Sequence, residues 1–217
     1  IAISGTIETM GTMLAGQAIE AFYTSIEHMK PLYVGLNCAT GPEFMRSHIR
    51  SLAKISKYPV AVVPNAGIPD ADGLYQESPD DLAKVLESFV DESWINVLGG
   101  CCGTTPKHIE ALVKFKDKPF RKIKGDPNSY LSGIDFLEIE DNSGPYIVGE
   151  RTNVIGSRKF KTLITEGKLD EAAEIARKQV KAGAHIIDVC LSNPDRDEKQ
   201  DMIDFLSKVT KMTKAPI

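Results

Sequence analysis

The sequence predicts an α/β protein in which parts of two (β/α)8 TIM-type barrels lie on either side of a linker. Short β-rich runs alternate with amphipathic segments, and this alternation indicates a parallel sheet with crossover helices. The repeating unit is close to the roughly 30 residues that one strand–helix unit of a barrel occupies. The expected strands also end in polar or reactive residues, and such barrels carry their chemistry at the carboxyl ends of the strands.

The composition excludes several classes of function. The 217 residues are 42% hydrophobic and 26% charged, as in an ordinary globular protein, and the net charge is −4. This mildly acidic balance offers no basic footprint for nucleic acid or an anionic membrane, and no apolar run reaches the roughly 20 residues of a membrane span. The first residues lack both Met and a charged segment. We therefore expect no signal peptide, a cytoplasmic protein and an excerpt of a longer chain.

Four strand–helix units are expected before the linker. Helix starts are well marked: Ser78 is a candidate N-cap, Pro79 takes the first helical position, and the acidic residues that follow favour the helix dipole. Thr105 and Pro106 repeat this pattern. The expected strands span residues 1–3, 32–37, 60–63 and 95–98, and the expected helices span residues 17–28, 42–57, 79–92 and 106–115.

Residues 117–145 are polar and rich in turn formers, which predicts a linker between a first domain (1–116) and a second domain (146–217). In the second domain, residues 169–182 carry acids early and bases late and are followed by Gly183, a pattern that predicts a helix. The other expected elements are strands at 146–149, 186–189 and 215–217 and a helix at 197–211.

The cysteines are Cys38, Cys101, Cys102 and Cys190. Nothing marks the chain as secreted, and an adjacent pair joins itself only with strain, so we expect no disulfide framework. Metal binding or catalysis is the better interpretation of such cysteines.

Three of these cysteines predict a metal site. If the strands follow barrel order, Cys38 and the pair Cys101 and Cys102 lie at strand ends on one face, and Gly99 and Gly100 allow a tight turn. Three thiolates at one point form a zinc site with an open position, which is typical of catalytic zinc because structural sites fill all four positions. For Cys38 alone, the role of a small buried hydrophobic residue stays an alternative.

Several segments resemble homocysteine S-methyltransferase domains. The most specific is GGCCGTTPKHI at residues 99–109, and GLNCATGP at 35–42 and PNAGIP at 64–69 follow the family's order. Short motifs upstream extend the resemblance over about residues 1–115.

The resemblance implies the chemistry of the first domain. Cys38, Cys101 and Cys102 would hold zinc, and the sulfur of homocysteine would take the fourth place as a thiolate. In this family, the asparagine that matches Asn65 holds the fourth position while substrate is absent. The alternative for Asn65 is a turn residue in a loop rich in Pro and Gly.

Residues 148–157 (VGERTNVIGS) resemble the start of the pterin-binding barrel that follows the homocysteine domain in cobalamin-dependent methionine synthases. The resemblance implies methyl transfer from methylcobalamin to homocysteine, giving methionine, with methyltetrahydrofolate as the co-substrate that restores the methyl group. The cobalamin module of the parent protein would be a partner. Residues 1–116 would be the C-terminal half of one barrel and 146–217 the start of the next, so we do not expect 217 residues alone to form a closed, active enzyme.

The resemblance also places a pterin site in the second domain, formed by Glu150, Arg151, Asn153 and Asp188. A strand-end cap for Asp188 and a structural ion pair for Arg151 are the alternatives. One position departs from the family: where Asp-x-Asn is usual, this chain has Cys190 in place of the asparagine. A thiol cannot reproduce the hydrogen bonds of an amide to a pterin, so the departure weighs against folate.

Two alternatives therefore stay open. One is a cobalamin-independent homocysteine methyltransferase fused to a non-folate pterin-type barrel, and the other is an inactive zinc-binding fragment. The histidines have no partner at ligand spacing, and we expect structural or surface roles for them; they are His28, His48, His108 and His185.

Overall fold

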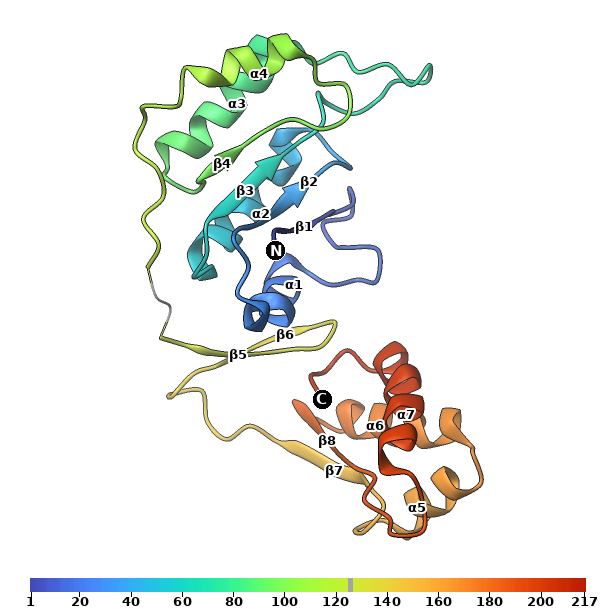
Figure 1. The fold of residues 1–217 in the computed structure, drawn as a ribbon. Helices are drawn as coiled ribbons and strands as arrows, with labels where there is room; N and C mark the ends of the chain where they lie inside the picture. Colours follow the sequence, from blue (N-terminus) through green and yellow to red (C-terminus); the bar gives the residue numbers. More distant parts are fainter. Residues whose placement is uncertain (125–126) are drawn as a thin grey trace. The chain divides into compact units, whose positions relative to one another are not determined.

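The computed structural model describes residues 1–124 and 127–217, which form two compact units, Ile1–Pro127 and Asn128–Ile217 (Figure 1). Gly125 and Asp126, inside the expected linker, lie outside the described residues. Each unit contains parallel strands and helices, which confirms the α/β class. Within the described ranges, no helix is both long enough and apolar enough to cross a membrane.

The first unit contains a four-stranded parallel sheet whose strands follow each other in chain order. Parallel neighbours joined in order through helices are the arrangement of successive barrel units, as the alternation predicted. The strands are β1 (Ile3–Gly5), β2 (Val34–Asn37), β3 (Val60–Val63) and β4 (Val97–Leu98). The first strand is displaced from the expected residues 1–3, and the other three lie within their expected ranges.

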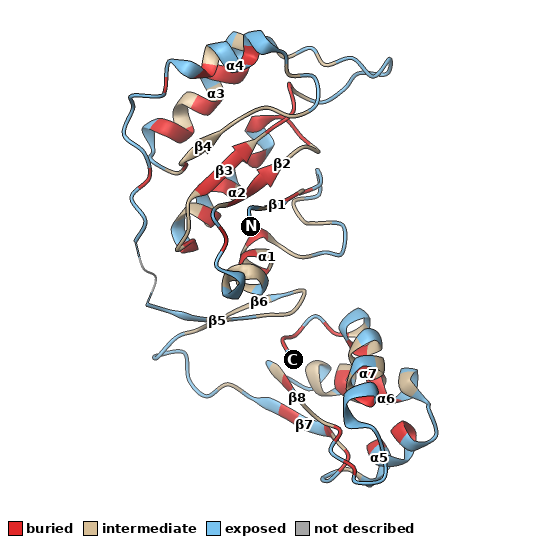
Figure 2. Ribbon diagram, viewed as in Figure 1, coloured by how far each residue is buried: buried red, intermediate tan, exposed pale blue. Residues whose placement is uncertain are grey.

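Four α-helices and a short 3-10 helix follow or connect these strands: α1 (Ile19–Ile26), η1 (Glu27–Met29), α2 (Pro42–Ile55), α3 (Pro79–Asp91) and α4 (Pro106–Val113). The last three begin with Pro, and Ser78 caps α3 by accepting a hydrogen bond from the backbone N–H of Asp81 at 3.2 Å. The central strands β2 and β3 are buried (Figure 2), so the core lies between them and the inner faces of the helices. Because the helices pack against the sheet, the carboxyl ends of its parallel strands are held in register.

Arg121, inside the expected linker, belongs to the first unit. Its side chain is buried, and its guanidinium donates hydrogen bonds to backbone carbonyls at and beyond the end of α2. Nη2 donates to Ala53 O at 2.8 Å and also to Ser56 O, and Nη1 donates to Tyr58 O at 3.1 Å. A helix leaves its last carbonyls without partners, and Arg121 satisfies them from a distant part of the chain.

The second unit has two parallel strands, β7 (Val148–Asn153) and β8 (Ile186–Cys190), and three helices, α5 (Arg158–Thr165), α6 (Leu169–Lys181) and α7 (Glu198–Met212). Its core contains an edge-to-face pair, Phe160 and Phe205, with ring centroids 5.1 Å apart. Strands β7 and β8 and helices α6 and α7 were predicted, whereas α5 was not.

The expected linker is not uniformly irregular, because it contains an antiparallel hairpin, β5 (Ser129–Ser132) and β6 (Phe136–Ile139). The hairpin turn contacts the end of the chain, where Asp135 N donates to Lys214 O at 2.9 Å. The expected strand at 215–217 is not formed as a strand. Its backbone nevertheless runs beside β8, since Ile187 N donates to Pro216 O at 2.9 Å.

Replacing Arg121 by Met should lower the free energy of unfolding of the first unit by about 2–4 kcal/mol, because several buried carbonyls lose a charged donor. Arg50→Met is the matched control, since Arg50 is exposed on α2. The measurement is urea unfolding followed by fluorescence of Trp94, the single tryptophan of the chain. Equal losses for the two variants would show that the buried guanidinium does not stabilise the helix end.

The pair Arg196 and Asp201 should make the stability of the second unit depend on pH. The two side chains form a bidentate pair with N–O distances of 2.6 and 2.7 Å, and this hydrogen bonding lowers the pKa of Asp201. Stabilisation is then complete above the unfolded pKa of about 3.9 and is lost as the pH falls through the lower folded pKa. Asp201→Asn should weaken the protection of α7 amides against hydrogen exchange at neutral pH but not at strongly acidic pH. Asp204→Asn, on the same helix, is the control.

Candidate functional site

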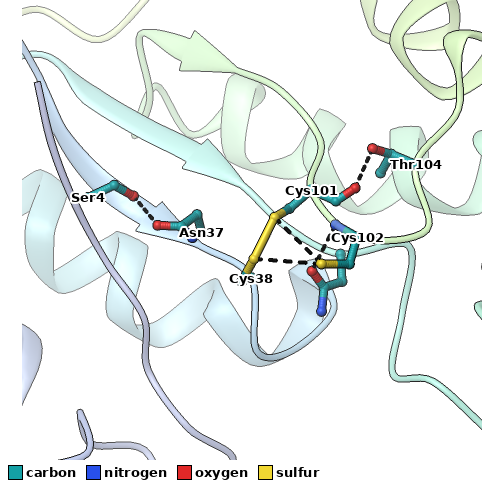
Figure 3. Close-up of a disulfide and its surroundings, with 7 residues drawn as sticks. Ser4, Asn37, Cys38, Cys101, Cys102 and Thr104 are labelled. Carbon is teal, nitrogen blue, oxygen red and sulfur yellow. Dashed lines mark hydrogen bonds between the residues drawn. A yellow bond between two sulfur atoms is a disulfide. The ribbon is translucent and has the colours of Figure 1, made fainter. Parts of the chain in front are cut away.

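The carboxyl end of β3 brings the cysteine-bearing segments together. Val63 O accepts a hydrogen bond from Cys38 N at 3.1 Å, and Pro64 O accepts one from Cys101 N at 2.7 Å. Since β2 and β4 flank β3 in the sheet, the segments that follow them reach this end from opposite sides. Figure 3 shows Cys38, Cys101 and Cys102 at one point. The placement predicted from barrel order, with both cysteine segments at strand ends on one face, is confirmed.

A turn with positive φ angles, directly after β2, sets the direction of the Cys38 side chain. Cys38 and Ala39 both have positive φ angles, 57° and 47°, although neither is glycine. Thr40 N closes the turn by donating to Cys38 O at 2.7 Å. Non-glycine residues in the left-handed region persist only when their surroundings fix them, and they cluster at functional sites. Before the turn, Ser4 Oγ on β1 donates to Asn37 Oδ1 at 2.5 Å and fixes the end of β2.

The second segment is a tight turn from Cys101 to Thr104. Thr104 donates to Cys101 O twice, from its backbone N at 3.1 Å and from Oγ1 at 2.6 Å. Gly103 has φ +77°, the conformation that the third position of a type II turn requires. The expectation that Gly99 and Gly100 supply the turn is therefore corrected. Gly100 allows a close approach instead, because a Cβ there would lie 2.6 Å from Thr104 Oγ1.

The three sulfur atoms lie within 4.8 Å of one another. Cys102 Sγ is 3.9 Å from the Sγ atoms of both Cys38 and Cys101, and the latter two are paired as a disulfide (Figure 3). The sequence predicts no disulfide framework, and the structure differs at this one pair. The physical reason is that the two cysteines face each other across the end of β3 with Cα atoms 5.7 Å apart, a separation suited to a disulfide.

The reduced form of the same cluster fits zinc. A tetrahedral zinc with bonds of about 2.3 Å to sulfur sets its thiolates roughly 3.8 Å apart. The two separations of 3.9 Å that involve Cys102 match this value, and Cys102 is exposed, so ligands can reach the cluster from solvent. Among the described residues, the group of possible metal ligands at this point consists of these three cysteines. Three thiolates without a fourth protein ligand form an open site, whereas a structural zinc site has four protein ligands.

Asn65 is buried and supports the pair of cysteines. Its Oδ1 accepts a hydrogen bond from Cys102 N at 3.2 Å, and the next residue, Ala66, donates its N–H to Cys102 O at 2.9 Å. Asn65 thus lies at the site, as the sequence predicted, and together with Ala66 it holds the backbone N–H and C=O of Cys102. Its role as a fourth ligand stays a prediction.

The start of α4 follows directly on the turn that carries Cys102. Thr105 and His108 form a capping box, and His108 Nε2 lies 3.0 Å from Glu77 O. His108 is buried, so the structural role expected for it is confirmed. Burial, and next the charge of Asp81, raise the pKa of the Glu77 carboxyl, while His108 opposes the shift.

The four residues of the predicted pterin site lie on β7 and β8 of the second unit: Glu150, Arg151, Asn153 and Asp188. Asn153 Oδ1 accepts hydrogen bonds from Ile155 N and Gly156 N, and its Nδ2 lies 3.3 Å from Glu150 Oε1. Asn153 pairs in register with Cys190, so the position that departs from the family is adjacent to the predicted site. Glu150, Arg151 and Asp188 are exposed.

Sequence reasoning missed three residues at the cysteine cluster: Ser4, Thr104 and Tyr75. Ser4 acts through a hydrogen bond to Asn37 that depends on how neighbouring strands meet, whereas Thr104 bonds the backbone of Cys101 within its own turn. Tyr75 carried a weak indication, since it is an aromatic residue among polar turn formers in the loop that follows β3.

Replacing Gly103 by Ala should cost more stability than replacing Gly73 by Ala, although both glycines have nearly the same φ, +77° and +78°. A Cβ on Gly103 would lie 2.3 Å from Cβ and Cγ of Tyr75, whereas nothing lies within 4 Å of one on Gly73. We expect losses of about 2–5 kcal/mol for Gly103→Ala and about 1–2 kcal/mol for Gly73→Ala, from urea unfolding of the first unit. Equal losses would contradict the close packing of Tyr75 on the turn.

Known proteins resemble the chain in two parts. Residues 1–115 match the family model of homocysteine S-methyltransferase, and residues 149–217 match that of pterin binding enzyme. The chain is 38% identical over 220 residues to methionine synthase of Mycobacterium tuberculosis, an alignment that covers 98% of this chain and 18% of that protein. The chain thus spans less than a fifth of the length of this relative.

Among solved structures, the chain resembles the oxidized form of the homocysteine methyltransferase MmuM from Escherichia coli, with a TM-score of 0.37 and 19% identity. This match covers 51% of this chain and 33% of that one. The match of residues 1–115 spans more than half of the 217 residues and includes every cysteine of the cluster. The chain therefore belongs to the homocysteine S-methyltransferase family.

Proposed function

We propose that the chain carries the zinc site at which homocysteine is methylated to methionine, with Cys38, Cys101 and Cys102 as the metal ligands. The observation that carries the proposal is the meeting of the three Sγ atoms at the carboxyl end of a parallel sheet, within 4.8 Å of one another. The family match over residues 1–115 supports the same substrate.

A free thiol has a pKa of roughly 8.5, so homocysteine is mostly protonated at neutral pH. When bound, zinc supplies the positive charge that turns a coordinated thiol into a thiolate at neutral pH. The chain's own residues make this possible by position: Cys38 is aimed by its left-handed turn, and Asn65 and Ala66 fix Cys102. Three protein ligands leave one place for the substrate sulfur, and Asn65 is the side chain proposed to occupy it while substrate is absent.

The methyl donor proposed for the whole protein is methylcobalamin, which is restored from methyltetrahydrofolate. The match of residues 149–217 to pterin binding enzymes and the likeness to a methionine synthase support this donor pair. The folate contacts proposed in the second unit are Glu150, Arg151, Asn153 and Asp188, at β7 and β8. The cobalamin module of the parent protein would be the partner, and we propose a cytoplasmic location for the whole.

Cys190 favours an alternative in which the second unit serves a donor other than folate, because a thiol stands where an amide would bind a pterin. Methyl transfer assays of the parent protein with methylcobalamin and with methyltetrahydrofolate separate the two possibilities. Transfer from neither donor supports the alternative, which is independent of cobalamin and of folate. Transfer from methyltetrahydrofolate through bound cobalamin supports the leading proposal.

The zinc site is tested by metal analysis and X-ray absorption of the reduced chain, with and without homocysteine. We expect one zinc per chain with three sulfur ligands, rising to four when homocysteine is added. Serine variants of Cys38, Cys101 and Cys102 should each lose most of the zinc. Cys190→Ser is the matched control, because Cys190 lies in the other unit, and it should keep zinc unchanged.

Two outcomes would contradict the proposal in different ways. Zinc absent from the reduced, zinc-supplied chain would remove the metal site itself. Zinc bound with an unchanged sulfur count after homocysteine is added would leave a zinc-binding fragment without catalytic function, which is the second alternative that the sequence left open.

A further inference from the structure

A cleft at the amino ends of β3 and β4 gathers positive charge. It has a volume of about 690 Å³ and lies within the first unit, at the opposite end of the sheet from the cysteine cluster. One carboxylate, that of Glu92, lines it, whereas the remaining charged side chains are cations, although the whole chain has a net charge of −4. The cations are Arg50, Lys54, Arg121, Lys122 and Lys124.

Hydrogen bonds hold the walls of this cleft in place. Arg121 N donates to Ile95 O at 3.3 Å, and Asn96 Nδ2 donates to Arg121 O at 2.8 Å, so the segment around Arg121 is fixed beside the start of β4. The guanidinium of Arg121 is already bound to carbonyls at the end of α2, and it therefore fixes the wall rather than a ligand.

The other four cations of the cleft are exposed, and none of them forms a salt bridge with any residue that the structure describes. Like charges that line one cleft repel one another and create a positive potential inside it. A bound anion removes this repulsion, so the cleft favours a ligand that carries several negative charges.

Two aromatic rings line the same cleft. Trp94 is half-buried, and its ring packs against that of Phe89 with centroids 5.6 Å apart. The turn before it is fixed, because Ser93 has a φ angle of 55° and Trp94 N donates to Phe89 O at 3.0 Å. Phe120 is 71% exposed, so its ring is accessible to a ligand. Aromatic rings stack on planar bases, and lysine and arginine side chains bind phosphates.

We propose that this cleft binds a nucleoside polyphosphate, with the exposed cations at the phosphates and Phe120 and Trp94 at the base. The volume of the cleft falls within the range of about 300–1,000 Å³ that is typical of small-molecule sites. Stacking accepts any base because every base has a flat face, so we expect little selection among bases. The inference goes beyond the proposed methyl transfer and is independent of it, because no cysteine of the cluster lines the cleft.

The test is isothermal titration calorimetry of the full chain with ATP in the absence of magnesium, together with the fluorescence of Trp94, which is the single tryptophan and lines the cleft. Tripolyphosphate and adenosine probe the phosphate and ring contacts separately. We expect one ATP to bind per chain and to quench Trp94. Tripolyphosphate and adenosine should each bind at least about 10-fold more weakly, because each lacks one of the two kinds of contact.

Two variants test the two kinds of contact. Lys122→Gln and Phe120→Ala should each weaken ATP binding about 10-fold, since the first removes a charged phosphate contact and the second a stacking ring. The matched controls are Lys84→Gln and Phe44→Ala, because Lys84 on α3 and Phe44 on α2 are exposed and do not line the cleft. Both controls should bind ATP as the unmodified chain does.

The outcomes separate a nucleotide site from a general anion site. Tripolyphosphate that binds as tightly as ATP would overturn the assignment to a nucleotide. Failure of the unmodified chain to bind ATP, or equal weakening by the cleft variants and their controls, would overturn the site itself. Zinc content plays no part in these measurements, so failure of this inference would leave the proposed zinc site standing, and loss of the zinc site would leave this inference standing.

Discussion

The end of strand β3 is the constraint on which the site depends. Its last carbonyls, those of Val63 and Pro64, accept hydrogen bonds from Cys38 and Cys101 on either side. Backbone pairing of this kind leaves little freedom, because a parallel strand continues its register into the residues that follow it. Two thiols that are 63 residues apart in sequence therefore meet, with Cα atoms 5.7 Å apart, before any ligand contributes. The metal chemistry proposed here uses a geometry that the sheet has already built.

Sequence reasoning found the parts of the fold that are encoded locally. Pro at the first position predicts helices α2, α3 and α4. Short apolar runs that alternate with these helices predict β2 and β3. It missed α5, whose start depends on the Ser157 side chain accepting a hydrogen bond from Phe160 N, and it missed the hairpin of β5 and β6 in a polar segment. The local composition of the hairpin resembles a loop, so tertiary contacts decide its structure, whereas the N-cap of α5 is a local signal that was overlooked.

In the cysteine site too, some features could be predicted from the local sequence and others depend on tertiary structure. The identity and convergence of the three cysteines followed from residue type and barrel order, because strand ends of a parallel sheet share one edge. The turn that aims Cys38 could not be predicted, since neither Cys38 nor Ala39 is a residue that favours positive φ. The packing of Tyr75 on Gly103 was equally hidden, because it joins two loops that only the sheet brings together. Asn65 was predicted as a fourth metal ligand, and the structure shows a different role for it, as the acceptor for Cys102 N.

The burial of Arg121 beneath the end of α2 has a consequence for the order in which the molecule is made. The guanidinium that completes this helix lies 68 residues downstream of Ala53, whose carbonyl it binds. At roughly 5–20 residues per second, a ribosome needs about 3–14 s to synthesise the intervening segment, and part of it is still inside the exit tunnel when α2 has emerged. The first unit is thus completed only when Arg121, which lies beyond its last helix, has been synthesised. A nascent chain that ends before Arg121 would expose the carbonyls at the end of α2 to solvent and chaperones.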